Sequence, residues 1–182
     1  MHRLIQTIGE EELPDGTLST RYRFVHVLYQ NAVYQDLMTN RRVSLHRQTG
    51  DLMIRSYGGE ARRLATQLAT HFDRGRDFER AVEFLVHAGD NAMQIHANEK
   101  AVEHYSRAVG FMPKLACEKQ SSMLAAIYRK RGAAYLATGH FGDAIEDFSN
   151  LLHQACKSYN RAMEHGALNA LAEAYLLRTS SG

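Results

Sequence analysis

Apolar residues at helical spacing, running from Glu60 almost to the C-terminus, restrict the fold of this chain more than any other feature. They recur every three or four positions, which places them on one face of an α-helix. Only two prolines occur in 182 residues, so long helices can form with few breaks. The spacing predicts helices over residues 60–73, 77–93, 97–110, 117–138, 141–154 and 160–177. Because the joints between them are short, neighbouring helices should be antiparallel.

Small and large residues follow one another in a recurring order within these helices. The clearest unit is Gly132-x-x-Tyr135 followed by Gly139-x-Phe141-x-x-Ala144-x-x-x-Phe148-x-x-Leu151. Gly132 and Ala144 would let two helices approach closely, and large side chains would fill the space beside them. Less regular matches are Ala69-x-x-Phe72 with Phe78-x-x-Ala81, Gly89-x-x-Ala92 with Ala101-x-x-x-Tyr105, and Ala172-x-x-Tyr175.

This order of small and large residues resembles the tetratricopeptide repeat, in which helical hairpins stack into a solenoid. We take the alanines at positions 81, 101 and 144 as equivalent, so the spacing between repeats is irregular. The resemblance implies a mostly α fold with a tetratricopeptide-like helical solenoid of degenerate repeats. A generic helical bundle is the alternative.

The N-terminal residues follow a different pattern, typical of a β-hairpin. Pro14-Asp15-Gly16 is a strong turn signal. It separates a β-compatible segment at residues 4–8 from a segment in which Thr20, Tyr22 and Phe24 alternate with arginines. We therefore predict two antiparallel strands that pack on the helices following them.

Two further helices are predicted before the repeat region. One covers residues 26–38, and the second begins with Thr39 or Asn40 as its cap and is weakened at Gly50. Tyr57-Gly58-Gly59 then predicts a domain boundary. The expected domains are a module of residues 1–57, with a hairpin and two helices, and a tetratricopeptide-like region of residues 58–182.

The module also resembles a known arrangement, through Tyr22-x-Phe24-x-His26-x-Leu28-x-Gln30-x-x-x-Tyr34 and Arg41-Arg42-x-x-Leu45-His46. These residues are similar to the tail of bacterial STAND-type signal-transduction ATPases, in which a winged-helix region and a tetratricopeptide array follow the ATPase. The resemblance implies that residues 1–57 are a partial winged helix and that the chain is a fragment or split-off product of such a regulator. His26 and His46 match the pattern and are interpreted as hydrogen-bonding groups. The ATPase itself is not expected, because no lysine follows a glycine as its phosphate loop requires.

Composition and motifs argue against several functional classes. The net charge is only +2, from 22 basic and 20 acidic residues, so nucleic acid is not the expected partner. No apolar run is long enough to span a membrane or form a secretory signal, which favours a cytoplasmic location. The ten histidines and two cysteines form no recognisable metal motif, and no Gly-x-Ser-x-Gly nucleophile occurs. We therefore expect no catalytic residues, no metal and no cofactor.

The expected function is non-catalytic protein–protein interaction within a bacterial signalling or transcription-regulating assembly. The partner would be another protein or the adjacent domains of a larger regulator. By repeat position, the polar side chains lining the inner groove would be Arg63, Thr66, Thr70, Arg129, Asn169 and Glu173. We also expect self-association through the C-terminal helix, whose apolar stripe has no following helix to cover it.

Two other functions are alternatives to protein–protein interaction. The first is a DNA-binding regulator fragment that uses the winged-helix-like module, with Arg41, Arg42 and Arg47 contacting the nucleic acid. The second is an enzyme, against which the missing phosphate loop argues.

Overall fold

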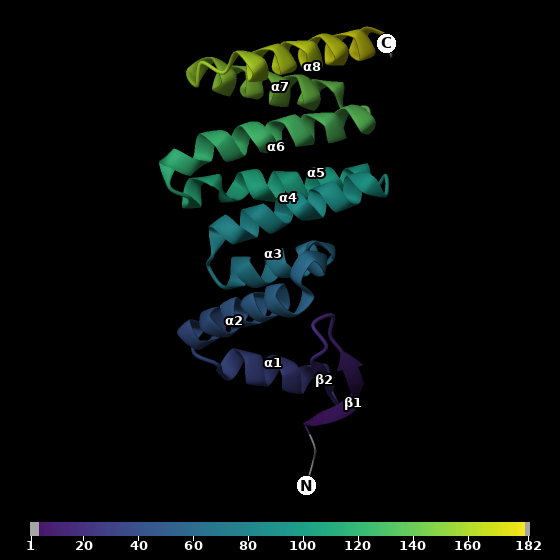
Figure 1. Cartoon of the computed structure of the whole chain (residues 1–182), viewed down its shortest axis with the longest axis vertical. Coiled ribbons are helices and arrows are strands. Elements are labelled where there is room, and N and C mark those ends of the chain that lie inside the picture. Colours follow the sequence, from purple (N-terminus) through teal and green to yellow (C-terminus); the bar gives the residue numbers. More distant parts are fainter. Residues whose placement is uncertain (1–3, 181–182) are drawn as a thin grey trace. The chain divides into compact units, whose positions relative to one another are not determined.

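Two compact units make up the chain in the computed structural model, which describes residues 4–180 (Figure 1). Unit 1 ends at Asp77 and unit 2 begins at Phe78. Unit 1 contains the only sheet within the described residues, and unit 2 is helical throughout.

The predicted hairpin at the start of unit 1 is confirmed. Strands β1 (Ile5–Glu12) and β2 (Leu18–Phe24) are antiparallel, and a bulge before Gly9 shifts their register. The turn forms as the sequence indicates, because the Asp15 carboxylate accepts a hydrogen bond of 2.9 Å from the Thr17 N–H. Gly16 supplies the positive φ of 81° that the turn requires.

Unit 1 continues with α1 (Val27–Asp36), α2 (Thr39–Tyr57), the 3₁₀ segment η1 (Gly58–Leu64) and α3 (Ala65–Arg74). His26 caps α1, since its Nδ1 accepts a hydrogen bond of 3.1 Å from the Leu28 N–H. The expected cap of α2 by Thr39 or Asn40 is wrong. Met38 occupies the cap position and gives no side-chain hydrogen bond, because the helix already begins at Thr39.

Gly50 is a packing contact rather than a weak point of α2. The helix runs through it without a break, and a Cβ at this position would lie 2.8 Å from the ring of Phe72 on α3. The missing side chain therefore lets α2 and α3 approach closely. Because α2 packs on η1 and α3, the expected boundary at Gly58-Gly59 falls inside unit 1.

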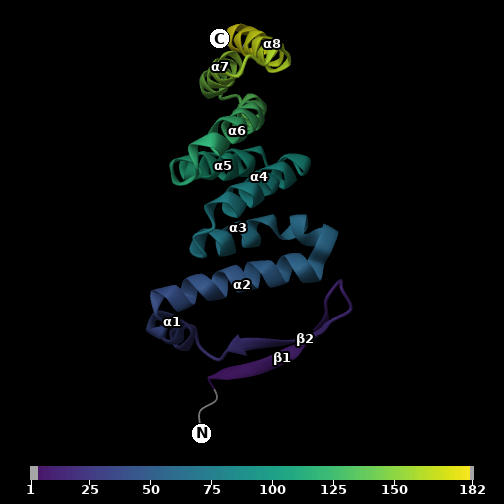
Figure 2. The same ribbon diagram turned by 60° about the vertical axis from the view of Figure 1, so that its left-hand side comes forward.

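Unit 2 is a stack of antiparallel helices (Figures 1 and 2). It contains α4 (Phe78–Gln94), α5 (Asn98–Phe111), the short η2 (Met112–Lys114), α6 (Cys117–Ala137), α7 (Phe141–Lys157) and α8 (Arg161–Ser180). The helices predicted for this unit are confirmed, with ends that differ by a few residues. The helix predicted over residues 60–73 is instead divided between η1 and α3 of unit 1. Short turns join α4 to α5, α6 to α7 and α7 to α8, which gives a tetratricopeptide-like stack of helical hairpins.

Two hairpins of unit 2 repeat the same packing. Gly89 on α4 faces Tyr105 on α5, and 43 residues later Gly132 on α6 faces Phe148 on α7. Ala101 and Ala144 are fully buried on the second helix of each pair. Ala81 on α4 is equally buried, but α3, the helix expected to pair with α4, belongs to unit 1, so the equivalence of Ala81 to these two alanines stays a prediction.

Candidate interaction site

An open apolar cleft of about 210 Å³ lies between α4 and α6 of unit 2. Its walls are Val82, Glu83, Val86 and His87 from α4, with Met123, Ala126 and Ile127 from α6. On each helix, lining residues four positions apart, such as Val82 and Val86, point in the same direction. The lining side chains of α4 and α6 therefore face each other across the cleft. Val82 and Ile127 form a buried floor, whereas Ala126 is exposed at the opening.

The polar groups of this cleft come from one rim only. The Glu83 carboxylate lies 4.0 Å from His87 Nε2, one helical turn away. Every other lining side chain is apolar. The arrangement can therefore accept an apolar side chain of a partner and exclude water around it.

A second cleft of about 200 Å³ adjoins the first. It is lined by Ser122, Ala125, Ala126, Arg129, Leu151 and Met163, from α6, α7 and α8. Ala126 lines both clefts, so they meet on the surface of α6. The guanidinium of Arg129 has no ion-pair partner within residues 4–180 and can contact a partner segment.

A polar contact fixes α6 to α4 beside the first cleft. Lys130 Nζ on α6 lies 2.5 Å from both carboxylate oxygens of Asp90 on α4. The Tyr105 hydroxyl on α5 donates a further hydrogen bond of 2.8 Å to Asp90. Burial, reinforced by this hydrogen bond, raises the pKa of Tyr105, so the hydroxyl remains a donor.

A buried ion pair fixes α6 to α7. Arg131 binds Asp147 through two hydrogen bonds, from Nε at 2.8 Å and from Nη2 at 2.7 Å. Its Nη1 donates to Ser106 on α5 at 3.1 Å. The Asp147 side chain is only 2% exposed, and burial raises the pKa of its carboxyl while the guanidinium opposes that rise. Together the two contacts hold the walls of both clefts before any partner arrives.

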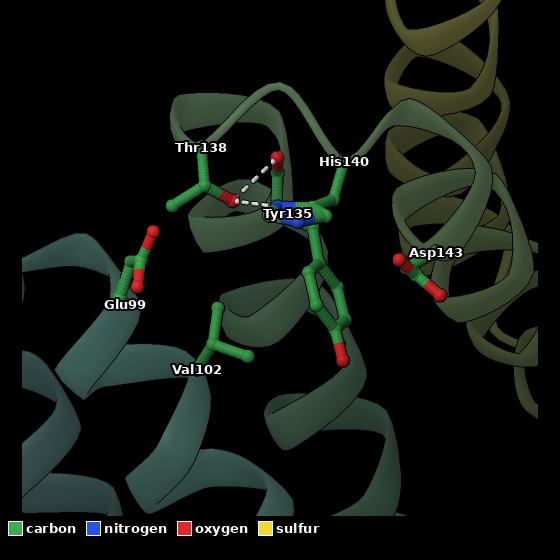
Figure 3. A pocket seen from close by; sticks show the side chains of 6 residues that line it. All are labelled: Glu99, Val102, Tyr135, Thr138, His140 and Asp143. Atoms are coloured by element: carbon green, nitrogen blue, oxygen red, sulfur yellow. Dashed lines mark hydrogen bonds between the residues drawn. The ribbon is translucent and has the colours of Figure 1, made fainter.

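A polar pocket of about 350 Å³ lies where α5 begins and α6 joins α7 (Figure 3). Glu99, Val102, Tyr135, Thr138, His140 and Asp143 line it. The Thr138 hydroxyl donates to the Tyr135 carbonyl at 3.1 Å and lies 2.8 Å from His140 Nδ1, within hydrogen-bond distance. Within residues 4–180 neither carboxylate of the pocket has a hydrogen bond or ion pair, so both can contact a polar group from outside.

Three titratable side chains link the helices of unit 1. The Tyr34 hydroxyl on α1 lies 2.9 Å from His46 Nε2 on α2, and His46 Nδ1 lies 3.1 Å from His71 Nδ1 on α3. The interpretation of His26 and His46 as hydrogen-bonding groups is thus confirmed. Burial lowers the pKa of His46 and of His71, and the positive charge of Arg74 lowers both further.

The structure gives the three arginines proposed for DNA contact separate tasks. Arg47 Nε donates a hydrogen bond of 2.6 Å to the Gly75 carbonyl, which anchors α2 to the end of α3. The Arg42 guanidinium lies 5.4 Å from the centre of the Tyr34 ring. Arg41 remains exposed. Two of the three therefore already have intramolecular contacts.

The six polar residues predicted to line an inner groove lie in different places. Arg63 pairs with Glu60 at 2.7 Å, and the Thr70 hydroxyl donates to the Thr66 carbonyl at 2.9 Å, all within unit 1. In unit 2, Arg129 lines the second cleft. Asn169 and Glu173 are exposed on α8 and line neither cleft.

The sequence pattern does not reveal the apolar cleft. Its side chains follow the same helical spacing as the core, so the sequence does not distinguish Val86 or Met123 from buried residues. Over residues 4–180, no group of three or more His, Cys, Asp or Glu is arranged to hold a metal ion. In the same range no helix combines the length and apolar character needed to cross a membrane.

Comparisons with known proteins give only distant likenesses. No family model matches the sequence, and no curated protein matches it.

A Podospora anserina protein described as a kinesin light chain, with nearly identical TPR-like repeats, has a solved structure similar to this chain. Its single-residue variant is 17% identical, with 82% of this chain and 83% of that chain covered and a TM-score of 0.45. The unsubstituted form is 16% identical, with the same coverage and a TM-score of 0.44. MamA of MSR-1 is 15% identical, covers 84% of this chain and 99% of its own, and has a TM-score of 0.22.

Proposed function

We propose that the chain is a non-catalytic interaction segment and that unit 2 binds a protein partner through the apolar cleft between α4 and α6. The observation that carries this proposal is an apolar opening whose walls are held by ion pairs on α6. A partner residue such as Leu, Ile or Met would fill the cleft. Arg129 at the adjoining cleft would add a polar contact to the backbone or to an acidic side chain.

Binding gains free energy because an apolar side chain of the partner is buried, and it loses little because the cleft is already ordered. Full burial of one aliphatic side chain contributes about 1.5–3 kcal/mol. Lys130 and Arg131 already fix α6 through Asp90 and Asp147, so the partner does not have to order the cleft. A short segment with one apolar anchor and a few backbone contacts should therefore bind with measurable but modest affinity.

We further propose that the chain is a segment of a bacterial signalling or transcription-regulating ATPase in the cytoplasm. The motif from Tyr22 to Tyr34, with Arg41-Arg42 after it, supports this assignment through its resemblance to STAND-type regulators. In such a protein residues 1–57 would form part of a winged helix, and the partner of unit 2 could be an adjacent domain. A coding sequence for an ATPase directly upstream would support this assignment, and an unrelated upstream gene would count against it.

A peptide selection tests the cleft. The full chain is used to select from a phage-displayed library of random short peptides, and the enriched peptides are synthesised for titration. We expect enriched sequences to share an aliphatic residue and to bind Ala126→Glu about tenfold or more weakly, because the new carboxylate stands in the opening.

Ala172→Glu is the matched control, since Ala172 is also an exposed helical alanine and lines neither cleft. Equal weakening by both substitutions, or no enrichment at all, would contradict binding at the cleft. The DNA-binding alternative is tested separately with duplex DNA at micromolar protein. We expect no shift at any salt concentration, whereas a salt-dependent shift would favour that alternative.

A further inference from the structure

Helix α1 in unit 1 carries several large apolar side chains and yet has no buried residue. Leu28 is 66% exposed, Val33 45% and Tyr29 42%. Apolar side chains gathered on an exposed surface mark an interaction site, and a ten-residue helix is marginally stable when it stands alone in water. The exposed side of α1 therefore has the properties of an uncovered interface.

One side of α1 is already occupied, which identifies the free side. The Tyr34 hydroxyl contacts His46, so this side of the helix faces α2. At 100° per residue, the opposite side carries Leu28, Tyr29, Ala32 and Val33, which we call the α1 stripe. Ala32 lies in the middle of the stripe, where a small side chain permits close approach of a second helix.

The charges of α1 indicate what would cover it. Its one charged residue is Asp36 at the C-terminal end, with no acidic residue in the first turn and no basic residue in the last. No charged residue of α1 itself therefore compensates either end of the helix dipole, and Asp36 stands at the end where a negative charge is unfavourable. A second α1 running in the opposite direction would place Asp36 beside a positive helix N-terminus.

We propose that α1 packs antiparallel against α1 of a second copy of this chain through the α1 stripe. The contact is isologous, so each copy's Asp36 compensates the N-terminus of the other. The stripe has no charge in its centre that would repel a second copy. Its area is well below the roughly 800 Å² per partner of a standard interface, so the dimer is weak and depends on concentration.

Sedimentation velocity of the full chain over a hundredfold concentration range tests the dimer. We expect a concentration-dependent monomer–dimer equilibrium that Leu28→Glu shifts to monomer. Leu176→Glu is the matched control, because Leu176 is 68% exposed on α8, the helix expected from the sequence to associate. A wild-type chain that stays monomeric overturns the proposal, and so does a dimer that only Leu176→Glu disrupts.

Asp36→Lys separates dimerisation from folding. Lysine improves the electrostatics at the end of its own helix, so circular dichroism of the monomer should not weaken. In the dimer the same lysine stands beside the partner's positive helix end, and we expect the dimer Kd to rise several-fold. An unchanged Kd would overturn the antiparallel arrangement.

Cross-linking tests the direction of the helices. In a background with the exposed Cys117 and Cys156 changed to serine, Ala32→Cys should form a disulfide-linked dimer, because antiparallel helices bring their midpoints together. Leu28→Cys should not, because each Leu28 then faces the far end of the other helix. Cross-linking of Leu28→Cys without cross-linking of Ala32→Cys would overturn the proposal.

Discussion

Gly132 faces the ring of Phe148 so closely that a Cβ on the glycine would lie 2.5 Å from Phe148 Cε1. Gly89 has the same relation to Tyr105 in the preceding hairpin. These two contacts set how closely α6 approaches α7 and α4 approaches α5. The two hairpins therefore share one packing arrangement, in which an aromatic ring on the second helix packs against a glycine on the first.

Gly132→Ala should destabilise unit 2 although alanine is the better helix former. The added methyl group displaces a buried ring and should cost about 1–3 kcal/mol, more than the gain of roughly 1 kcal/mol in helix propensity. Gly142→Ala is the control, because a Cβ there meets nothing within 4 Å and should stabilise α7. Chemical denaturation of both variants checks this. A more stable Gly132→Ala would show that the packing is looser than described.

Substitutions of Arg131 and Asp147 should have strongly non-additive effects on the free energy of unfolding. Arg131→Leu leaves a buried carboxylate without its partner and should cost about 3–5 kcal/mol. Adding Asp147→Leu removes the unpaired charge and should recover much of that loss. The free energies of unfolding of both single variants and the double variant give the coupling. Additive losses would contradict a direct buried pair.

The division after Asp77 predicts which fragment folds. Residues 78–182 should keep their helical circular dichroism and unfold cooperatively, since the hairpins of unit 2 pack on one another. A fragment of residues 58–182 would carry η1 and α3 without α2, which exposes the Phe72 ring that packs against Gly50. We expect this longer fragment to bind more of a hydrophobic dye. Equal dye binding by the two fragments would indicate that α3 does not need α2.

Stability should fall as the pH drops through the histidine range. Burial lowers the pKa of His46 and His71 below the ordinary value of 6.5, so the unfolded chain takes up protons first. The stabilising contribution is therefore complete above that value and is lost as the pH falls towards the lowered pKa values. Thermal unfolding at several pH values should show this, with a flatter profile for His46→Gln. A profile as steep in His46→Gln as in the wild type would contradict this contribution of His46.

Local signals predicted much of this fold, and contacts distant in sequence explain where prediction failed. Pro14-Asp15-Gly16 and the Gly132-x-x-Tyr135 unit report on neighbouring residues, and the hairpin and helix pairs they predict are present. The role of Gly50 depends on Phe72, a residue on another helix that no local pattern indicates.

The candidate site illustrates the same limit. Ala126 lines both clefts, but an exposed alanine at helical spacing is indistinguishable from a core position in the sequence. Arg63 and Arg129 were grouped by repeat position, yet the structure places them in different units, where Arg63 already pairs with Glu60. The irregular spacing of the motifs does not fix which helix begins each pair, so repeat position alone does not show which residues share a surface.

The most direct measurement of the central claim is the mapping of a selected peptide on the full chain by amide chemical-shift perturbation in NMR. We expect the largest changes at Val86, Met123 and Ala126, with little change around His140 in the polar pocket. Changes centred on that pocket, on α8 or on unit 1 would contradict partner binding in the cleft between α4 and α6.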